Sequence, residues 1–381
     1  MRVYLSGCLA MLLCMISAGC TFYTSPGQCT NPNPGAGAGA GDSNAGGSAN
    51  NGGASGDGPV VGTPMGEWVN VTSNLAGLDS MCGNSGLIVT KPDTDQVIAG
   101  IAQQGLWSST DAGQSWGQVR GSTKITMSLS AVIFDPMDST RQWVVGNHAP
   151  PYLFGTTDDG KTFNDLTEGS DLPGLDYVSV DYADPKRDFM LVGWHEIAQG
   201  VSRSTDGGKT WESIGKGLPK VFCSTPVVID AQTYLVGCQD GQIMRTTDGA
   251  KTWVKVSDQG SNRAPVQASD GVLYWVSIDG SLVASDDSGE TWQQILVKGT
   301  LVGNLPPLEL PDGRIAAFGD NGIVAGTRTG AWKRVTVKTP YLPYTIAYSA
   351  LGKAFYFAYG DCTKIVPDDA IQSYAFDYEV E

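Results

Sequence analysis

An eight-residue pattern that occurs five times is the feature that most limits how this chain can fold. Its form is Ser/Thr-x-Asp-x-Gly-x-Ser/Thr followed by an aromatic residue, with Ala250 replacing the glycine in one copy. A short Asp side chain accepts hydrogen bonds from backbone N–H groups of its own turn, and glycine supplies a positive φ. The pattern therefore predicts a tight turn between two antiparallel strands. The copies are Ser109–Trp116, Thr156–Phe163, Ser204–Trp211, Thr246–Trp253 and Ser285–Trp292.

The spacing of the copies predicts the architecture. Their aromatic residues recur every 39 to 48 positions, and Trp68 and Trp332 extend the same rhythm in both directions. A period of roughly 40–45 residues that holds four short strands is typical of a β-propeller blade. We therefore predict an all-β fold, a seven-bladed propeller of four-stranded antiparallel blades over residues 66–381. The five aromatic residues of the turns are Trp116, Phe163, Trp211, Trp253 and Trp292.

Neither end of this region holds a complete blade. Trp68 to Val71 has no strands before it, and three strand-like runs after Trp332 have no final aromatic strand. We expect the N-terminal strand to close the last blade, because this arrangement removes two open sheet edges. The sixth blade departs from the pattern, since its turn before Trp332 lacks the Asp.

The first 65 residues predict export and a tether. Residues 1–20 hold Arg2, an apolar run too short to cross a membrane, and the sequence Ser17-Ala18-Gly19-Cys20. This ending resembles the lipobox of a bacterial lipoprotein signal peptide, which implies lipidation of Cys20, although Ser17 stands where Leu is usual. An ordinary cleaved signal peptide is the alternative. Residues 21–65 are rich in Gly, Ala, Asn, Ser and Pro, and we predict a disordered linker.

The repeated turn resembles the Asp-box, or BNR-like repeat, of sialidase-like and sortilin-like β-propellers. Hydrogen bonding within the turn suffices to explain the repeated carboxylates, so we interpret them as structural, with calcium binding or catalysis as the alternative. A resemblance to sialidases implies three arginines that bind the carboxylate of the substrate, and a Phe/Tyr-Arg-Ile-Pro motif in the first strand. No arginine lies between Arg2 and Arg120, so that motif is absent. The turn carboxylates are Asp111, Asp158, Asp206, Asp248 and Asp287.

Five cysteines remain after Cys20. Cys223 and Cys238 flank a predicted hairpin turn, which places them opposite one another on adjacent strands and predicts a disulfide. Cys82 and Cys362 could bridge the seam between the first and last blades. Cys29 is then left over in the linker, so this pairing stays open, as does a set of free thiols.

The charge limits the partners. A net charge of −15 and a pI near 4.5 argue against nucleic acid and against electrostatic binding to anionic lipid. We therefore expect membrane attachment through the lipid anchor alone, and we predict a monomer. No motif indicates a cofactor.

The candidate site follows from the expected topology. Loops between the second and third strands lie on the face opposite the turn motifs, and both histidines of the protein fall in these loops. We predict a ligand site there; ordinary solvated loops are the alternative, and the spacing of His148 and His195 gives no local metal motif. The candidate residues are His148, Trp194, His195, Glu196, Asp240, Asp320 and Asp361.

These features favour a lipid-anchored envelope protein whose propeller binds a protein or a glycan, or serves in assembly, without catalysis. The alternative is an exported sialidase-like glycoside hydrolase, because two carboxylates at suitable separation could catalyse such a reaction. A structural spacer with no ligand is a third possibility. Thr21 after Cys20 gives no inner-membrane retention signal and favours the outer membrane by analogy.

Overall fold

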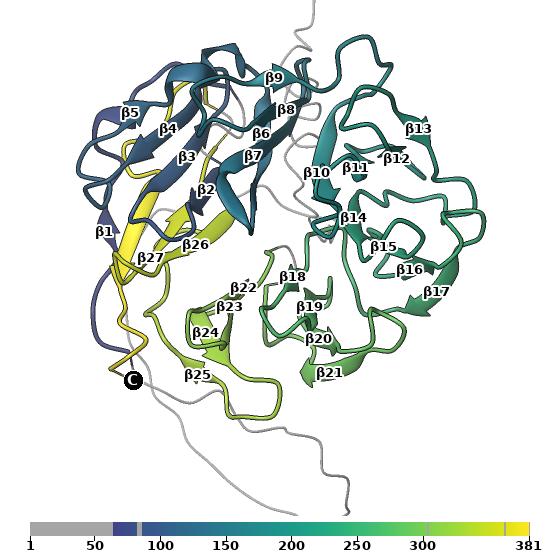
Figure 1. Ribbon diagram of the computed structural model, residues 1–381. Helices are drawn as coiled ribbons and strands as arrows, with labels where there is room; N and C mark the ends of the chain where they lie inside the picture. The colour runs from purple at the N-terminus through teal and green to yellow at the C-terminus, as the bar shows by residue number, and fades with distance from the viewer. Residues whose placement is uncertain (1–63, 82–85, 303–304, 362, 381) are drawn as a thin grey trace, which may run out of the picture. The chain divides into compact units, whose positions relative to one another are not determined.

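The chain forms seven four-stranded antiparallel sheets, the blades of a β-propeller (Figure 1). The computed structural model describes residues 64–81, 86–302, 305–361 and 363–380. Helical structure in these ranges is limited to two 3-10 turns, η1 (Ser73–Leu75) and η2 (Arg120–Lys124). The prediction of an all-β, seven-bladed fold is confirmed.

In blades one to six, four consecutive strands pair in chain order. Blade one contains β2 (Leu87–Thr90), β3 (Val97–Ile101), β4 (Gly105–Ser109) and β5 (Gly117–Gln118), and blade two contains β6 (Ser128–Asp135), β7 (Asp138–Asn147), β8 (Leu153–Thr156) and β9 (Asn164–Asp165). Blade three contains β10 (Leu175–Val180), β11 (Met190–Trp194), β12 (Val201–Ser204) and β13 (Glu212–Ser213), and blade four contains β14 (Thr225–Val228), β15 (Tyr234–Gly237), β16 (Ile243–Thr246) and β17 (Val254–Ser257). Blade five contains β18 (Val266–Gln267), β19 (Leu273–Val276), β20 (Leu282–Ser285) and β21 (Gln293–Leu296), and blade six contains β22 (Leu308–Glu309), β23 (Ile315–Gly319), β24 (Gly322–Gly326) and β25 (Lys333–Arg334).

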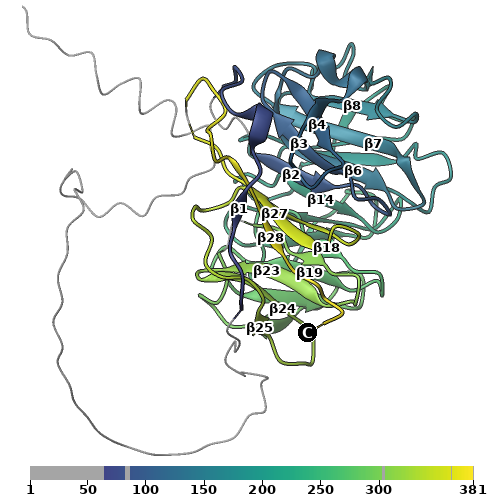
Figure 2. The ribbon, with the colours of Figure 1, turned by 90° about the vertical axis from the view of Figure 1, so that its left-hand side faces the viewer.

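Blade seven is built from both ends of the propeller. It holds β26 (Thr345–Ser349), β27 (Ala354–Ala358), β28 (Ile371–Ala375) and, as the outer strand, β1 (Val69–Asn70). Figures 1 and 2 show β1, in purple, against the yellow C-terminal strands. Val69 pairs with Ser373 and Asn70 with Gln372 in antiparallel register. The predicted closure by the N-terminal strand is thus confirmed, over two paired residues.

Seven hydrophobic clusters fill the spaces between consecutive blades, including the space between blades seven and one. Alternation along each strand supplies them, because successive side chains of a strand point to opposite faces. In β15, for example, Tyr234 and Val236 pack towards blade three, whereas Leu235 packs towards blade five. Each blade is therefore held on both faces, and the ring is closed.

The turn motifs satisfy their own polar groups. Asp206 accepts hydrogen bonds from the Thr210 hydroxyl at 2.6 Å, the Thr210 backbone N–H at 2.9 Å and the Ser204 hydroxyl at 2.8 Å. These bonds, the Thr210 hydroxyl first, lower the pKa of Asp206 to about 2. The other four turns repeat this arrangement, so hydrogen bonding within the turn accounts for the carboxylates. Ala250 takes a positive φ of 67° at the position where the pattern has glycine.

The tryptophans of three turn motifs also join one blade to the blade before it. Trp116 Nε1 donates to the carbonyl oxygen of Val71 at 2.9 Å, Trp211 Nε1 to that of Leu166 at 2.9 Å, and Trp253 Nε1 to that of Ile214 at 3.2 Å. In each case the acceptor follows the outer strand of the preceding blade. Trp116 therefore links blade one to the segment that closes the ring.

Several sequence predictions concern residues outside the described ranges. These are the signal peptide, the lipidated Cys20, almost all of the linker with Cys29, and the pairing of Cys82 with Cys362. Within the ranges, the sulfur atoms of Cys223 and Cys238 lie 2.09 Å apart, the distance of a disulfide. No helix among the described residues is long and apolar enough to cross a membrane.

Candidate functional site

The candidate residues occupy the loops that the topology predicts. We call the end of the blades that carries the loops between second and third strands the loop face. His148 follows β7, and His195 and Glu196 follow β11. Asp240, Asp320 and Asp361 occupy the corresponding loops of blades four, six and seven.

His195 is held from two sides by the start of blade three. Its Nδ1 atom lies 2.7 Å from Asp176 Oδ1, and Asp176 belongs to the inner strand β10. The His195 backbone N–H donates to the carbonyl oxygen of Gly174 at 2.7 Å. With Asp176 as the acceptor, the Nδ1 atom carries the proton, and the buried Nε2 atom lies 3.9 Å from Glu196 Oε1.

The two histidines form one electrostatic unit. The centres of the His148 and His195 rings are 5.2 Å apart. Burial opposes the charged form of His195, but the hydrogen bond and charge of Asp176, with the charge of Glu196, outweigh it and raise the pKa of His195. Burial and then the positive charge of His195 lower the pKa of His148. His195 therefore takes up a proton before His148 does as the pH falls.

Two buried polar atoms at this site have no hydrogen-bond partner among the described residues. They are Asn147 Oδ1 and His195 Nε2. Asn147 is only 7% exposed, and its amide nitrogen lies 3.0 Å from the Ser130 hydroxyl and 3.3 Å from His195 Nδ1. A buried polar group without a partner costs about 1–3 kcal/mol, so such atoms favour a ligand that supplies the missing bonds.

Not every candidate residue belongs to this group. Trp194 is partly buried against the core between blades two and three, and its indole N–H donates to the Ser202 hydroxyl at 3.1 Å, so it supports the loop. Asp240 accepts hydrogen bonds from Gln242 and Asp361 from Thr363, both within their own loops. In the part of the chain that the structure describes, no hydrogen bond or ion pair joins Asp240 or Asp320 to the histidines. Within the described ranges, no group of three or more His, Cys, Asp or Glu side chains could hold a metal ion.

Sequence reasoning did not select three residues that shape this site. Asp176 and Asn147 lie at the loop-face ends of β10 and β7. In the sequence, the only indication of their role is that each is a polar residue next to a buried position of a strand. Arg263, from the connection between blades four and five, is exposed, and its charge opposes the protonation of His195. Arg263 comes near His195 only because the closed propeller brings the loops of different blades together, so no local sequence pattern indicates it.

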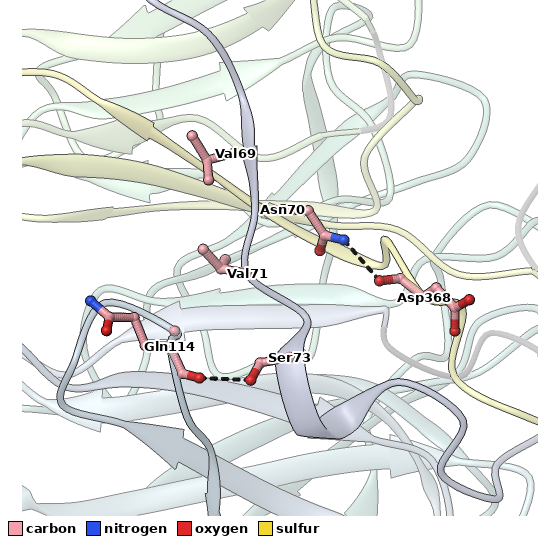
Figure 3. A pocket seen from close by; sticks show the side chains of 7 residues that line it. Val69, Asn70, Val71, Ser73, Gln114 and Asp368 are labelled. Atoms are coloured by element: carbon pink, nitrogen blue, oxygen red, sulfur yellow. Dashed lines mark hydrogen bonds between the residues drawn. The ribbon is translucent and has the colours of Figure 1, made fainter.

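A separate pocket lies at the seam of the ring, away from the histidines (Figure 3). It has a volume of ≈ 550 Å³ and is lined by residues of β1, of η1, of the first turn motif and by Asp368. Figure 3 shows the Asn70 amide bound to the carbonyl oxygen of Asp368 and the Ser73 hydroxyl bound to that of Gln114. Its polar groups are thus engaged in closing the ring, and we assign no ligand to it.

Comparisons with known proteins agree on the fold. No protein-family model matches the sequence, and a comparison with curated proteins gives no match. Among solved structures, a streptogramin B lyase aligns with a TM-score of 0.59 at 12% identity, over 82% of this chain and 98% of that chain. YCF48 bound to D1 peptide aligns with a TM-score of 0.54 at 15% identity, over 84% and 98%.

An ancestral GH74 enzyme aligns with a TM-score of 0.52 at 15% identity, over 75% of this chain. The alignment spans only 45% of the length of that enzyme. At these identities the similarity shows the fold, a β-propeller, and nothing finer.

Proposed function

We propose that this propeller is a non-catalytic binding or assembly module of a bacterial cell envelope, and that it binds a protein or a glycan at the group formed by Asn147, Asp176, His195 and Glu196. The observation that carries the proposal is the pair of buried atoms without partners, Asn147 Oδ1 and His195 Nε2. With His195 protonated, the first accepts a hydrogen bond and the second donates one. A hydroxyl or an amide, which both donates and accepts, fits such a pair.

The site supports binding better than it supports hydrolysis. Asp176 is engaged with His195, so it is not a free acid or base. The chain spans less than half of the GH74 enzyme to which it is similar, and it aligns with nearly the whole length of two other solved structures, a streptogramin B lyase and YCF48. By analogy with the latter, whose structure holds a peptide, a polypeptide ligand for this propeller is reasonable.

The location and the mode of attachment complete the proposal. A lipid on Cys20 would tether the chain, with the outer membrane favoured, and residues 21–65 would separate the propeller from the bilayer. The negative charge argues against nucleic acid as a partner, and we propose the lipid as the sole membrane contact. We propose that the protein acts as a monomer.

The test is a comparison of ligand capture by matched variants of the full chain from an envelope extract. Glu196→Gln and His195→Gln alter the proposed site, while Glu290→Gln changes an exposed residue of a turn motif and serves as the control. We expect the wild type and the control to retain the same ligand and both site variants to lose most of it, with thermal unfolding confirming that they are folded. Equal capture by all four proteins would refute the site.

A panel of fluorogenic glycosides addresses the alternative function. Sugar release by the wild type that is lost in Glu196→Gln would replace the binding proposal with a glycoside hydrolase. The panel is informative because a non-catalytic module releases no sugar from any member.

A further inference from the structure

A second polar group lies on the loop face, on blade seven. Tyr341 comes from the connection between β25 and β26, and Tyr359 and Asp369 come from the loop between β27 and β28. The two tyrosine rings are stacked, with centres 4.3 Å apart and planes inclined by 22°. Both hydroxyls donate to the same carboxylate, that of Asp369, with a distance of 2.7 Å for Tyr359.

The stack has one buried side and one open side. Tyr359 packs against the hydrophobic cluster between blades six and seven, and its backbone N–H donates to the carbonyl oxygen of Ala370 at 2.9 Å. Tyr341 covers the outer side of Tyr359 and remains 40% exposed. Because both hydroxyls are bound to Asp369, the rings are fixed in place, and a ligand that stacks on Tyr341 would meet an ordered surface.

The surroundings of the stack are acidic. Asp368 is exposed beside Asp369, and the charge of Asp361 contributes to the raised pKa of Tyr359, after burial and Asp369. Lys364, also exposed, is the only positive side chain in the described part of residues 359–370. An electron-rich ring face next to carboxylates attracts a cation.

From this arrangement we propose that Tyr341, Tyr359 and Asp369 form a receptor for an arginine side chain of a polypeptide partner. A guanidinium group is planar and stacks on an aromatic face, and its N–H groups match a carboxylate at the edge of that face. The net charge of −15 would favour the approach of such a partner. The inference rests on the proposed binding function and deepens it, since it selects a polypeptide over a glycan.

The test measures the binding of defined peptides to the full chain. The probe is a fluorescent peptide with three arginines separated by glycines, and its reference is the same peptide with neutral citrulline in place of arginine. Fluorescence anisotropy at low and at physiological salt gives the two dissociation constants. We expect the arginine peptide to bind about tenfold more tightly than the citrulline peptide, since it alone carries the cation.

Two variants locate the site. Tyr341→Leu keeps Tyr359 covered but removes the aromatic face, and Asp369→Asn removes the charge; each should weaken arginine binding about three- to tenfold. Leu351→Ala and Asp95→Asn, both exposed residues of hairpins at the opposite end of the blades, are the matched controls and should leave it unchanged.

Three results would overturn the arginine receptor. They are equal affinity for both peptides, no binding of either peptide, and an unchanged affinity in both Tyr341→Leu and Asp369→Asn. None of them bears on ligand capture at His195 and Glu196, which separate variants test. If ligand capture at His195 and Glu196 fails while the arginine peptide still binds, the arginine receptor stands and the proposed site at His195 is wrong. The two failures are therefore distinguishable.

Discussion

Two tryptophans in equivalent positions offer a test of how the blades are joined. Trp116 and Trp332 are both 4% exposed. Trp116 Nε1 donates to the Val71 carbonyl oxygen at 2.9 Å, whereas Trp332 Nε1 is buried without a hydrogen-bond partner among the described residues. Replacing each by phenylalanine removes the same atoms from similar surroundings, but removes a hydrogen bond in only one case.

The two substitutions should differ in their effect on the free energy of unfolding. Loss of the smaller ring of the indole costs about 1–2 kcal/mol in either protein, because it leaves a cavity. In Trp116→Phe the lost hydrogen bond adds about 1 kcal/mol and leaves the Val71 carbonyl without its partner. In Trp332→Phe the removal of an unpaired buried donor returns about 1–3 kcal/mol, so the net change is near zero. Because the cavity cost is common to both, we expect a difference of about 2–4 kcal/mol between the variants.

Thermal unfolding followed by circular dichroism or calorimetry measures this difference. For a domain of roughly 300 residues, 1 kcal/mol corresponds to about 1.5–2 °C in Tm, so the two midpoints should lie about 3–8 °C apart. Phe163 occupies the same position in blade two, which shows that the propeller accommodates phenylalanine there. If Trp332→Phe lowers Tm as much as Trp116→Phe does, the hydrogen bond is not what distinguishes these positions, and the reasoning fails.

Three further predictions concern other parts of the propeller. Cys223→Ser should lower stability by about 3 kcal/mol, because a disulfide to Cys238 would close a loop with a sequence separation of 15, and a reductant should lower the Tm of the wild type alone. Asp176→Asn should lower the pKa of His195, which an NMR titration measures. Because the pKa of His195 is raised in the folded protein, the stability that its protonation contributes is complete below the pKa of the unfolded state and is lost as pH rises through the pKa of the folded state. A pH profile of Tm that is the same in the variant and the wild type would contradict this. Gly193→Ala should cost more than about 3 kcal/mol, since an added Cβ would lie 1.8 Å from the Ser224 carbonyl oxygen, and a variant as stable as wild type in chemical denaturation would be inconsistent with that contact.

The repeated turns made the fold predictable, because each copy carries its own hydrogen bonds and its aromatic residue marks a strand. The closing strand was predictable for a similar reason, since Trp68 had no strands before it and blade seven lacked one. The site was predictable only in part. His148 and His195 lie 47 residues apart in the sequence and meet because neighbouring blades place equivalent loops together. Asp176 and the stacked tyrosines depend on contacts across loops or blades, for which no local pattern exists.

The closing strand has a consequence for the order in which the protein can fold. Val71 donates its backbone N–H to the carbonyl oxygen of Ile371, so a segment made before blades one to six finds its partner only after all six have been made. The inner blades contain mostly local pairings and can form as they emerge, but blade seven must wait with its outer strand unpaired. A nascent chain that stops before residue 371 lacks β28, so β1 has no partner strand and the outer edge of β27 stays open to other chains. Synthesis of β28, rather than formation of any single inner blade, is the event that allows the ring to close.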